Sequence, residues 1–229
     1  MKLLLTFLTV FILTYSSFAQ NEEALLQKVK AKMEKVNDYE AAGVMKLDVS
    51  FIKAPDSKVT IFFKKPNKFK VKKADGISIL PKGGVSVNTA SLLPVGSYQT
   101  IPGGKAVVDG ISTTIIKLIP ADEASDIVLS TLYIDEKEAV IRKAVVNTKE
   151  SGGYEIGMSY RKYTTWGLPD KVIFSFNTKD YKLPKGITFE YEKGGAKPVD
   201  DKSKNKKGSV TIVYESYKIN KGVEEKNFL

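Results

Sequence analysis

One amphipathic segment followed by a long series of alternating segments is the feature that most constrains how this chain can fold. Leu25, Val29, Met33 and Val36 recur at spacings of four, four and three, which places them on one face of a helix over residues 22–36. Beyond this helix, apolar and polar residues alternate with period two, as in strands with one buried face. The sequence therefore predicts one helix packed on a sheet.

The alternating segments predict strands that follow one another to the end of the chain. Met45, Leu47, Val49 and Phe51 alternate with polar residues, and a turn follows at Pro55. Later segments recur about every ten residues with no helical pattern between them, which favours an antiparallel meander over β-α-β units. The predicted strands cover residues 39–53, 59–63, 68–72, 77–80, 84–88, 105–109, 112–119, 128–135, 139–147, 154–163, 171–177, 186–192 and 209–219.

Two segments interrupt this rhythm. Residues 88–104 are apolar but aperiodic and contain Pro94 and Pro102, so we expect a lid or binding loop there, with glycines as points of freedom. Residues 193–208 are polar and poor in apolar side chains, as in the tip of a hairpin between the last two strands. We expect no linker between domains.

The N-terminus has the features of a secretory leader. Lys2 precedes an apolar run of about eleven residues, and small residues at positions 17 and 19 indicate cleavage before Gln20. The run is short of the roughly 20 residues that cross a bilayer, which argues against a membrane anchor. We therefore predict a signal peptide over residues 1–19, a single domain over residues 20–229 and a location in the periplasm.

The chain contains no histidine and no cysteine. Catalysis and metal binding that depend on imidazole or thiolate groups are therefore excluded. Asp122-Glu123 and Asp135-Glu136 are expected to be solvated charges at strand ends, although a serine–lysine dyad or a carboxylate pair stays open. We predict no catalytic residue, no cofactor and no bound metal, and hence a protein that is not an enzyme.

The net charge of +10 leaves two interpretations open. The lysines favour transient contact with an anionic membrane or an acidic envelope partner, with one cluster at Lys202–Lys207. They are equally consistent with solubilising charge on the outward faces of strands. No nucleic-acid-binding motif is present, so no nucleic acid partner is expected.

Apolar and aromatic side chains are abundant, with 11 tyrosines and 11 phenylalanines. Many of them alternate along strands, as at Phe174 and Phe176. They could fill the core of a β-sandwich, or they could line a cavity under a strongly curved sheet that one helix cannot fully cover.

Four stretches together resemble the LolA-like family of periplasmic carriers and sensors, the superfamily of LolA, LolB and RseB. They are the N-terminal helix leading into residues 39–53, the stretch Ile61–Val71, the pair Leu132–Asp135 and Ala139–Lys143, and the stretch Trp166–Phe176. The resemblance covers most of the chain after residue 20. It implies a strongly bent, incomplete antiparallel β-barrel with an N-terminal helix and a lid loop over an apolar cavity.

The resemblance also implies function and partners. It implies a monomeric carrier or sensor, without catalysis, that binds the acyl chains of a lipoprotein or a free lipid on its way to the outer membrane. The alternative is an envelope protein-interaction module with a filled core and a basic surface. Arg142 and Arg161, the only arginines, are expected to face solvent from strands. The candidate cavity residues are Leu25, Val29, Met33, Met45, Leu47, Phe62, Phe69, Leu92, Leu93, Tyr98, Phe174 and Phe176.

Overall fold

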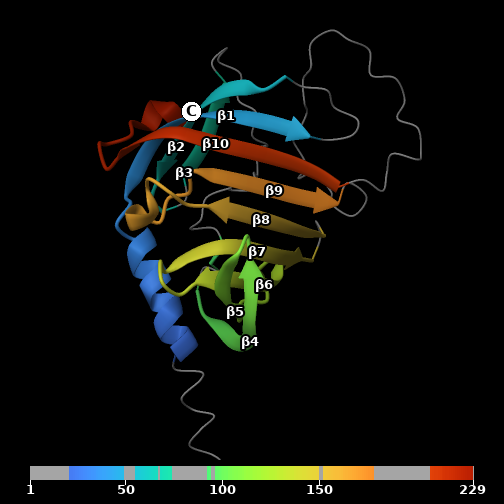
Figure 1. Ribbon diagram of the computed structural model, residues 1–229. Helices are drawn as coiled ribbons and strands as arrows, with labels where there is room; N and C mark the ends of the chain where they lie inside the picture. Colours follow the sequence, from blue (N-terminus) through green and yellow to red (C-terminus); the bar gives the residue numbers. More distant parts are fainter. Residues whose placement is uncertain are drawn as a thin grey trace, which may run out of the picture.

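The computed structural model describes residues 21–48, 55–66, 68–73, 92–93, 96–149, 152–177 and 207–228. In these segments, residues 21–33 form a helix and ten strands form one antiparallel sheet, as Figure 1 shows. The strands are β1 (Asp38–Asp48), β2 (Ser57–Lys64), β3 (Lys68–Lys73), β4 (Tyr98–Val108), β5 (Ile111–Pro120), β6 (Ile127–Asp135), β7 (Val140–Thr148), β8 (Gly153–Ser159), β9 (Lys171–Asn177) and β10 (Lys207–Ile219). Two short 3-10 helices, η2 (Thr164–Trp166) and η4 (Glu225–Phe228), complete the elements.

The strand order is β3-β2-β1-β10-β9-β8-β7-β6-β5-β4, and the sheet does not close. The first strand thus pairs with the last, so that Leu47 lies opposite Val210. From β10 back to β4, and from β1 to β3, neighbours in sequence are neighbours in the sheet. The edge strands β3 and β4 follow one another among the described strands but lie at opposite ends of the sheet.

Alternation along each strand gives the sheet an inner and an outer face. In β2, Val59, Ile61 and Phe63 are buried in the main core, and residues between them face the other way. The same core contains side chains from every strand except β4, together with helix residues Leu25 and Val29. The helix therefore lies on the inner face, where its apolar stripe is buried away from water.

The predicted mainly β fold with one N-terminal helix is confirmed. Strands β5, β6, β7, β9 and β10 agree with their predicted ranges within two residues. The helix ends at residue 33, three residues earlier than expected. The predicted strands at 77–80, 84–88 and 186–192, and nearly all of the predicted hairpin tip at 193–208, lie outside the described residues.

The predicted lid loop at 88–104 is wrong over its second half. Residues 98–104 belong to β4, where a register shift between Pro102 and Lys105 marks a bulge, and Gly104 has a positive φ of 79°. Proline is tolerated on an edge strand and glycine in a bulge. Both residues predicted a loop in the sequence, although the segment forms a strand. Only residues 92–93 and 96–97 of the remaining part are described.

Replacing Gly43 by alanine is expected to destabilise the fold by about 2–3 kcal/mol. Gly43 lies at a register shift in β1, and a Cβ there would sit 2.5 Å from the carbonyl oxygen of Val213 in β10. Backbone cannot move aside as a side-chain tip can. Urea unfolding measures the loss, and Gly157→Ala in β8 is the matched control because nothing lies within 4 Å of its added carbon. Equal stability of the two variants would contradict the close approach.

Candidate functional site

The inner face of the sheet is the candidate site, and it collects eleven of the twelve residues predicted to line a cavity. They come from the helix, from β1, β3, β4 and β9, and from the segment before β4, and they are buried in the core or packed against it. These residues are Leu25, Val29, Met33, Met45, Leu47, Phe69, Leu92, Leu93, Tyr98, Phe174 and Phe176.

Phe62 is the exception: it is buried, with 7% of its surface exposed, but it lies on the face of the sheet opposite to this core. Its neighbours Ile61 and Phe63 are in the core, whereas Phe62 lies opposite Lys70 of β3 with the ammonium of Lys72 5.5 Å from its ring centroid. The run Ile61-Phe62-Phe63 is apolar on both faces, so alternation alone could not assign Phe62 to one side. We correct its assignment from the inner to the outer face.

One end of the inner face is closed by aromatic rings. Tyr39 contacts Phe63 and Tyr217, with ring centroids 5.2 Å and 5.3 Å apart, and Tyr217 also contacts Tyr163 and Tyr214. The hydroxyl of Tyr217 donates to the carbonyl of Pro169 at 2.7 Å. Burial raises the pKa of Tyr39 well above its usual value, with a further contribution from Tyr214. Tyr39 and Tyr214 are therefore buried at this end, whereas Tyr163 and Tyr217 are half-buried.

The opposite end of the inner face carries an apolar end cluster formed by Leu47, Tyr154, Phe174, Phe176 and Val210. It lies where β1 and β9 end and where β8 and β10 begin, on the side to which the arrowheads of β1 and β9 point in Figure 1. Leu47 pairs with Val210, Val210 with Phe174, and Tyr154 with Phe176. Leu47, Tyr154 and Val210 are only half-buried. Phe174 and Phe176 are buried beside them.

Aromatic contacts give the apolar end cluster a defined shape. The ring of Phe174 lies 5.2 Å from that of Tyr154 and 5.5 Å from that of Phe176. Burial raises the pKa of Tyr154 to about 12, with a smaller contribution from the charge of Asp126. This raised pKa reflects the burial of the Tyr154 ring in the apolar end cluster.

A buried hydroxyl lies in the same cross-strand row. Ser130 of β6 pairs with Val146 of β7, and Val146 pairs with Tyr154 of the apolar end cluster. The Ser130 side chain is fully buried, and its oxygen has no hydrogen-bond partner among the described residues. A buried hydroxyl without a partner is costly, so Ser130 offers one polar contact within an otherwise apolar wall.

The helix is fixed to the sheet by polar contacts at both of its halves. Thr100 of β4 donates to Glu23 at 3.3 Å, Lys30 donates to the hydroxyl of Tyr98, and Lys32 donates to the backbone carbonyl of Glu138. A pocket of about 10 Å³, bordered by Val29, Met33, Ala139, Val140, Ile141, Tyr160 and Gly167, lies under the second half. That volume holds at most one water molecule, so helix and sheet are tightly packed there.

A charged groove of about 730 Å³ lies beside the turn between β6 and β7. It is lined by Lys105, Ile111, Ser112, Asp135, Glu136, Lys137, Glu138 and Arg142. Three acidic and three basic side chains line it, and Lys105 pairs with Glu136 at 3.2 Å. Such a lining suits polar groups and not an acyl chain.

Arg142 and Asp135 do not face solvent, contrary to expectation. The Arg142 side chain is 11% exposed and that of Asp135 is 6% exposed, and their nearest atoms are 2.7 Å apart. A register shift between Tyr133 and Ile134 makes Arg142 the extra residue of a bulge, which turns its side chain toward Asp135. Arg161 is exposed, as expected, but lies in the turn after β8 and not in a strand.

Alternation in the sequence identified Phe174 and Phe176 but not all of their neighbours. Val210 and Tyr154 fall in the apolar phase of their strands, yet only the pairing of β9 with β8 and β10, and of β10 with β1, brings them to the same end. Ser130 has no sequence signal, because a serine in a strand is ordinarily placed on the polar face.

The described segments contain no helix that is both long enough and apolar enough to cross a membrane. Within the same segments, no three acidic side chains come together as a metal site. The predicted signal peptide at 1–19 and the Lys202–Lys206 part of the lysine cluster lie outside the described residues.

Comparison with known proteins identifies the fold. No family model and no curated protein matches the chain. Among solved structures, it is similar to a Vibrio parahaemolyticus domain named for outer membrane lipoprotein sorting, with 12% identity, a TM-score of 0.55, and coverage of 90% of this chain and 94% of that one. It is also similar to a DUF1329 family protein from Desulfovibrio piger, with 11% identity, a TM-score of 0.54, and coverage of 90% and 96%.

A third similar structure carries the family name. A LolA superfamily protein from Nitrosomonas europaea is 10% identical, with a TM-score of 0.51 and coverage of 90% of this chain and 96% of that one. The protein therefore has a LolA-like fold: an open, bent antiparallel sheet with one N-terminal helix.

Proposed function

We propose that the protein is a non-enzymatic periplasmic carrier or sensor that binds the acyl chains of a lipoprotein or another amphiphilic lipid against the inner face of its sheet. The observation that carries this proposal is the apolar end cluster, in which Leu47, Tyr154 and Val210 are half-buried beside the buried rings of Phe174 and Phe176. An acyl chain that enters there would meet mainly apolar side chains, with the hydroxyls of Tyr154 and Ser130 beside them.

The dimensions of the sheet and the helix support this proposal. Ten strands span about 43 Å across, whereas a helix of 13 residues is only about 20 Å long and about 10 Å wide. One such helix cannot cover the whole inner face. Burial of each acyl CH₂ stabilises by about 0.8 kcal/mol, so a chain of ordinary length would bind usefully without directional contacts.

Ser130 supports an amphiphile as the ligand. Its unpartnered hydroxyl lies two strands from Tyr154, which is about 10 Å across the sheet. The ester or carboxyl group of a lipid is a hydrogen-bond acceptor that this hydroxyl could satisfy. A hydrocarbon without a polar head would leave the hydroxyl unpaired.

Native mass spectrometry of the purified protein tests the proposal. We expect a fraction of the protein to retain a bound amphiphile, identifiable after solvent extraction, and the delipidated protein to take up a fluorescent fatty acid. Lipid binding should also raise the thermal midpoint, because the ligand stabilises only the folded state. A protein that is free of ligand and takes up no fatty acid would refute the proposal.

The alternative is an envelope protein-interaction module with a filled core. The pocket under the second half of the helix measures only about 10 Å³, so at that position the structure favours the filled core. The same experiments separate the two functions, because a filled module would show neither retained amphiphile nor uptake.

A further inference from the structure

We propose that the outer face of β3, β2, β1, β10 and β9 is a docking surface for membranes that contain anionic lipids. Residues 57–73, which form the hairpin of β2 and β3, carry seven lysines and no acidic residue. Residues 98–149, which form β4 to β7, carry six basic and seven acidic residues. Because β3 and β4 are opposite edges, positive charge is concentrated at one end of the sheet.

Alternation places five of the seven lysines on one side of the hairpin. Lys58, Lys64, Lys68, Lys70 and Lys72 lie on the face opposite to the core residues of β2 and β3. Same-face neighbours are about 7 Å apart along a strand and about 5 Å apart across strands, so the ammonium groups form a dense array. Like charges that lie directly opposite destabilise a sheet, and such an array therefore favours a bound anion.

Only part of this array is neutralised within the protein. Lys64 and Lys68 lie opposite each other, and Glu225 of η4 pairs with both, at 2.9 Å from Lys64. The ammonium groups of Lys68 and Lys64 lower the pKa of Glu225 to about 2, so the carboxylate stays charged. The ammonium of Lys72 lies over the Phe62 ring, and neither Lys58 nor Lys72 forms a salt bridge with any described residue.

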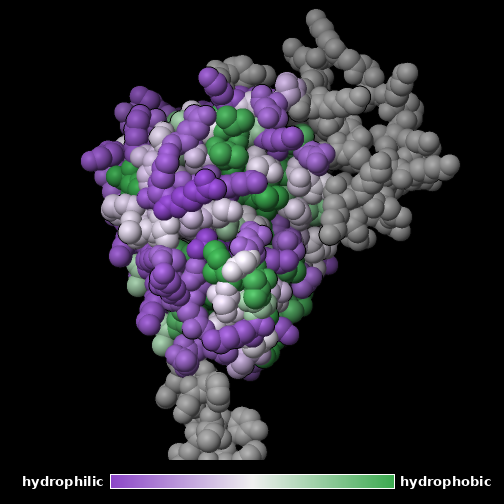
Figure 2. Space-filling view, in the orientation of Figure 1, coloured by the Kyte–Doolittle hydropathy of each residue, from purple (hydrophilic) through white to green (hydrophobic). Residues whose placement is uncertain are grey.

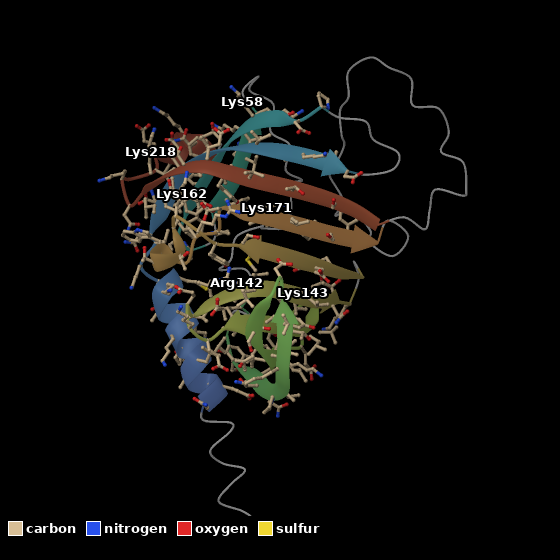
Figure 3. All side chains as sticks on the ribbon, viewed as in Figure 1. Lys58, Arg142, Lys143, Lys162, Lys171 and Lys218 are labelled. Carbon is tan, nitrogen blue, oxygen red and sulfur yellow. The ribbon has the colours of Figure 1, made fainter. Side chains whose placement is uncertain are left out.

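The surface continues across the middle of the sheet. Lys58 pairs with Val44, Val44 with Val213, and Val213 with Lys171, so two lysines about 14 Å apart flank two valines. Val213 is 45% exposed. Figure 2 shows apolar patches over β1, β10 and β9 surrounded by hydrophilic side chains, and Figure 3 labels Lys58, Lys171 and Lys218 around the same region.

Acidic residues are few on this face. Glu40 pairs with Lys218 at 2.8 Å, which neutralises both. Asp48 lies at the end of β1, away from Lys58, and Glu215, the extra residue at the register shift of β10, is exposed two residues from Val213. The lysines without an acidic partner are therefore left to attract an external anion.

Protection of a sheet edge does not account for these lysines. Lysines on edge strands do prevent edge-to-edge association, and β3 is an edge. However, β4 is also an edge and carries only Lys105 in its 11 residues. Lys58, Lys64 and Lys171 lie on β2 and β9, which are paired on both sides.

The side-chain chemistry favours a lipid surface over a specific acidic protein. An ammonium group is a hydrated point charge that suits diffuse attraction, whereas specific recognition of carboxylates favours the planar fork of arginine. Both arginines lie elsewhere, at Arg142 in the bulge of β7 and at Arg161 in the turn after β8. Lysines around an exposed valine match an interface with charged head groups over apolar chains.

Co-sedimentation with vesicles tests this surface. We expect binding to equimolar phosphatidylglycerol and phosphatidylcholine at about 0.02 M salt, weak binding to pure phosphatidylcholine, and loss of binding at about 0.3 M salt because screening shortens the range of the attraction. The triple variant Lys58→Gln, Lys72→Gln and Lys171→Gln should bind about 100-fold more weakly, since each lysine contributes a factor of about five.

The matched control removes the same charge from other places. The control triple variant, Lys28→Gln, Lys117→Gln and Lys137→Gln, changes lysines on the helix, on β5 and in the turn after β6. It should change vesicle binding less than threefold. An equal loss in both triples would overturn the proposed surface, as would equal binding of the wild type to both kinds of vesicle. If the protein binds polyglutamate as tightly as it binds anionic vesicles, and if the Lys58, Lys72 and Lys171 triple variant weakens both equally, the partner is an acidic polypeptide and not a membrane. Fatty acid uptake, measured without vesicles, should be the same in both triples, so failure of this surface is distinct from failure of the carrier function.

Discussion

Val210→Asp is expected to reduce the affinity for a fluorescent fatty acid at least tenfold, which corresponds to about 1.4 kcal/mol or more. Val210 is half-buried in the apolar end cluster between Leu47 and Phe174. A carboxylate at this position must lose water when an acyl chain packs against it, and an unpaired charge loses water at high cost. Aspartate is also too short to extend its charge back into solvent. Fluorescence titration of the delipidated protein measures the change.

A surface variant separates local from general effects of the new charge. Val128→Asp places the same carboxylate on β6 at a position that is 48% exposed, and it should bind as the wild type does. Val210→Trp fills the end of the inner face without adding charge and should also weaken binding. If Val210→Asp and Val210→Trp both fold, shown by circular dichroism, and both bind like the wild type, the acyl chain does not enter at this end.

Arg142→Met is expected to destabilise the protein by about 3–5 kcal/mol at pH 7. Arg142 donates to Asp135 from two nitrogens, at 2.7 Å and 3.1 Å, and its guanidinium lies 5.4 Å from the ring centroid of Tyr160. Removal of the guanidinium leaves the buried Asp135 carboxylate with only backbone donors such as the N–H of Glu138. Urea unfolding measures the loss. The double variant Asp135→Asn and Arg142→Met should recover most of it, because the amide keeps an acceptor for the turn and carries no charge.

The pH dependence gives the same pair a second signature. Burial by itself would raise the pKa of Asp135, but the hydrogen bond and charge of Arg142, with backbone N–H groups, outweigh burial and lower the pKa below its usual value of 3.8. The pair therefore stabilises the wild type above about pH 4 and loses this contribution as pH falls through the lowered pKa. In Arg142→Met, burial raises the pKa, so protonation relieves the penalty and the difference from the wild type narrows at low pH. A difference that is independent of pH would contradict a buried charge pair.

Most strands could be predicted because their signal is local. A strand with one buried face alternates with period two whatever its neighbours are, and β5, β6, β7 and β9 were predicted for this reason. The failures are places where another part of the chain decides. The segment 98–104 is a strand because β5 pairs with it across a bulge that accommodates Pro102 and Gly104. Arg142 is buried because a bulge brings it to Asp135.

The candidate site was predicted in its composition but not in its arrangement. Eleven of the twelve proposed residues share the inner face because each was chosen from the apolar phase of its own helix or strand. Phe62 could not be assigned, because its strand is apolar in both phases. The grouping of Leu47, Val210 and Phe174 depends on β10 pairing with β1 and β9. Because these residues are far apart in the sequence, the local sequence pattern does not predict their contact.

The sequence by itself determined the elements of this protein: one amphipathic helix, a set of strands with an apolar and a polar face, and an excess of lysine. These properties are periodic and depend only on neighbouring residues. The tertiary structure decided the strand order, which joins the first strand to the last and leaves β3 and β4 as edges. That order alone groups the tyrosines at one end of the inner face, brings Leu47, Val210 and Phe174 together at the other, and places Lys58 of β2 and Lys171 of β9 on one outer face, because nonlocal pairing sets which residues of distant strands become neighbours.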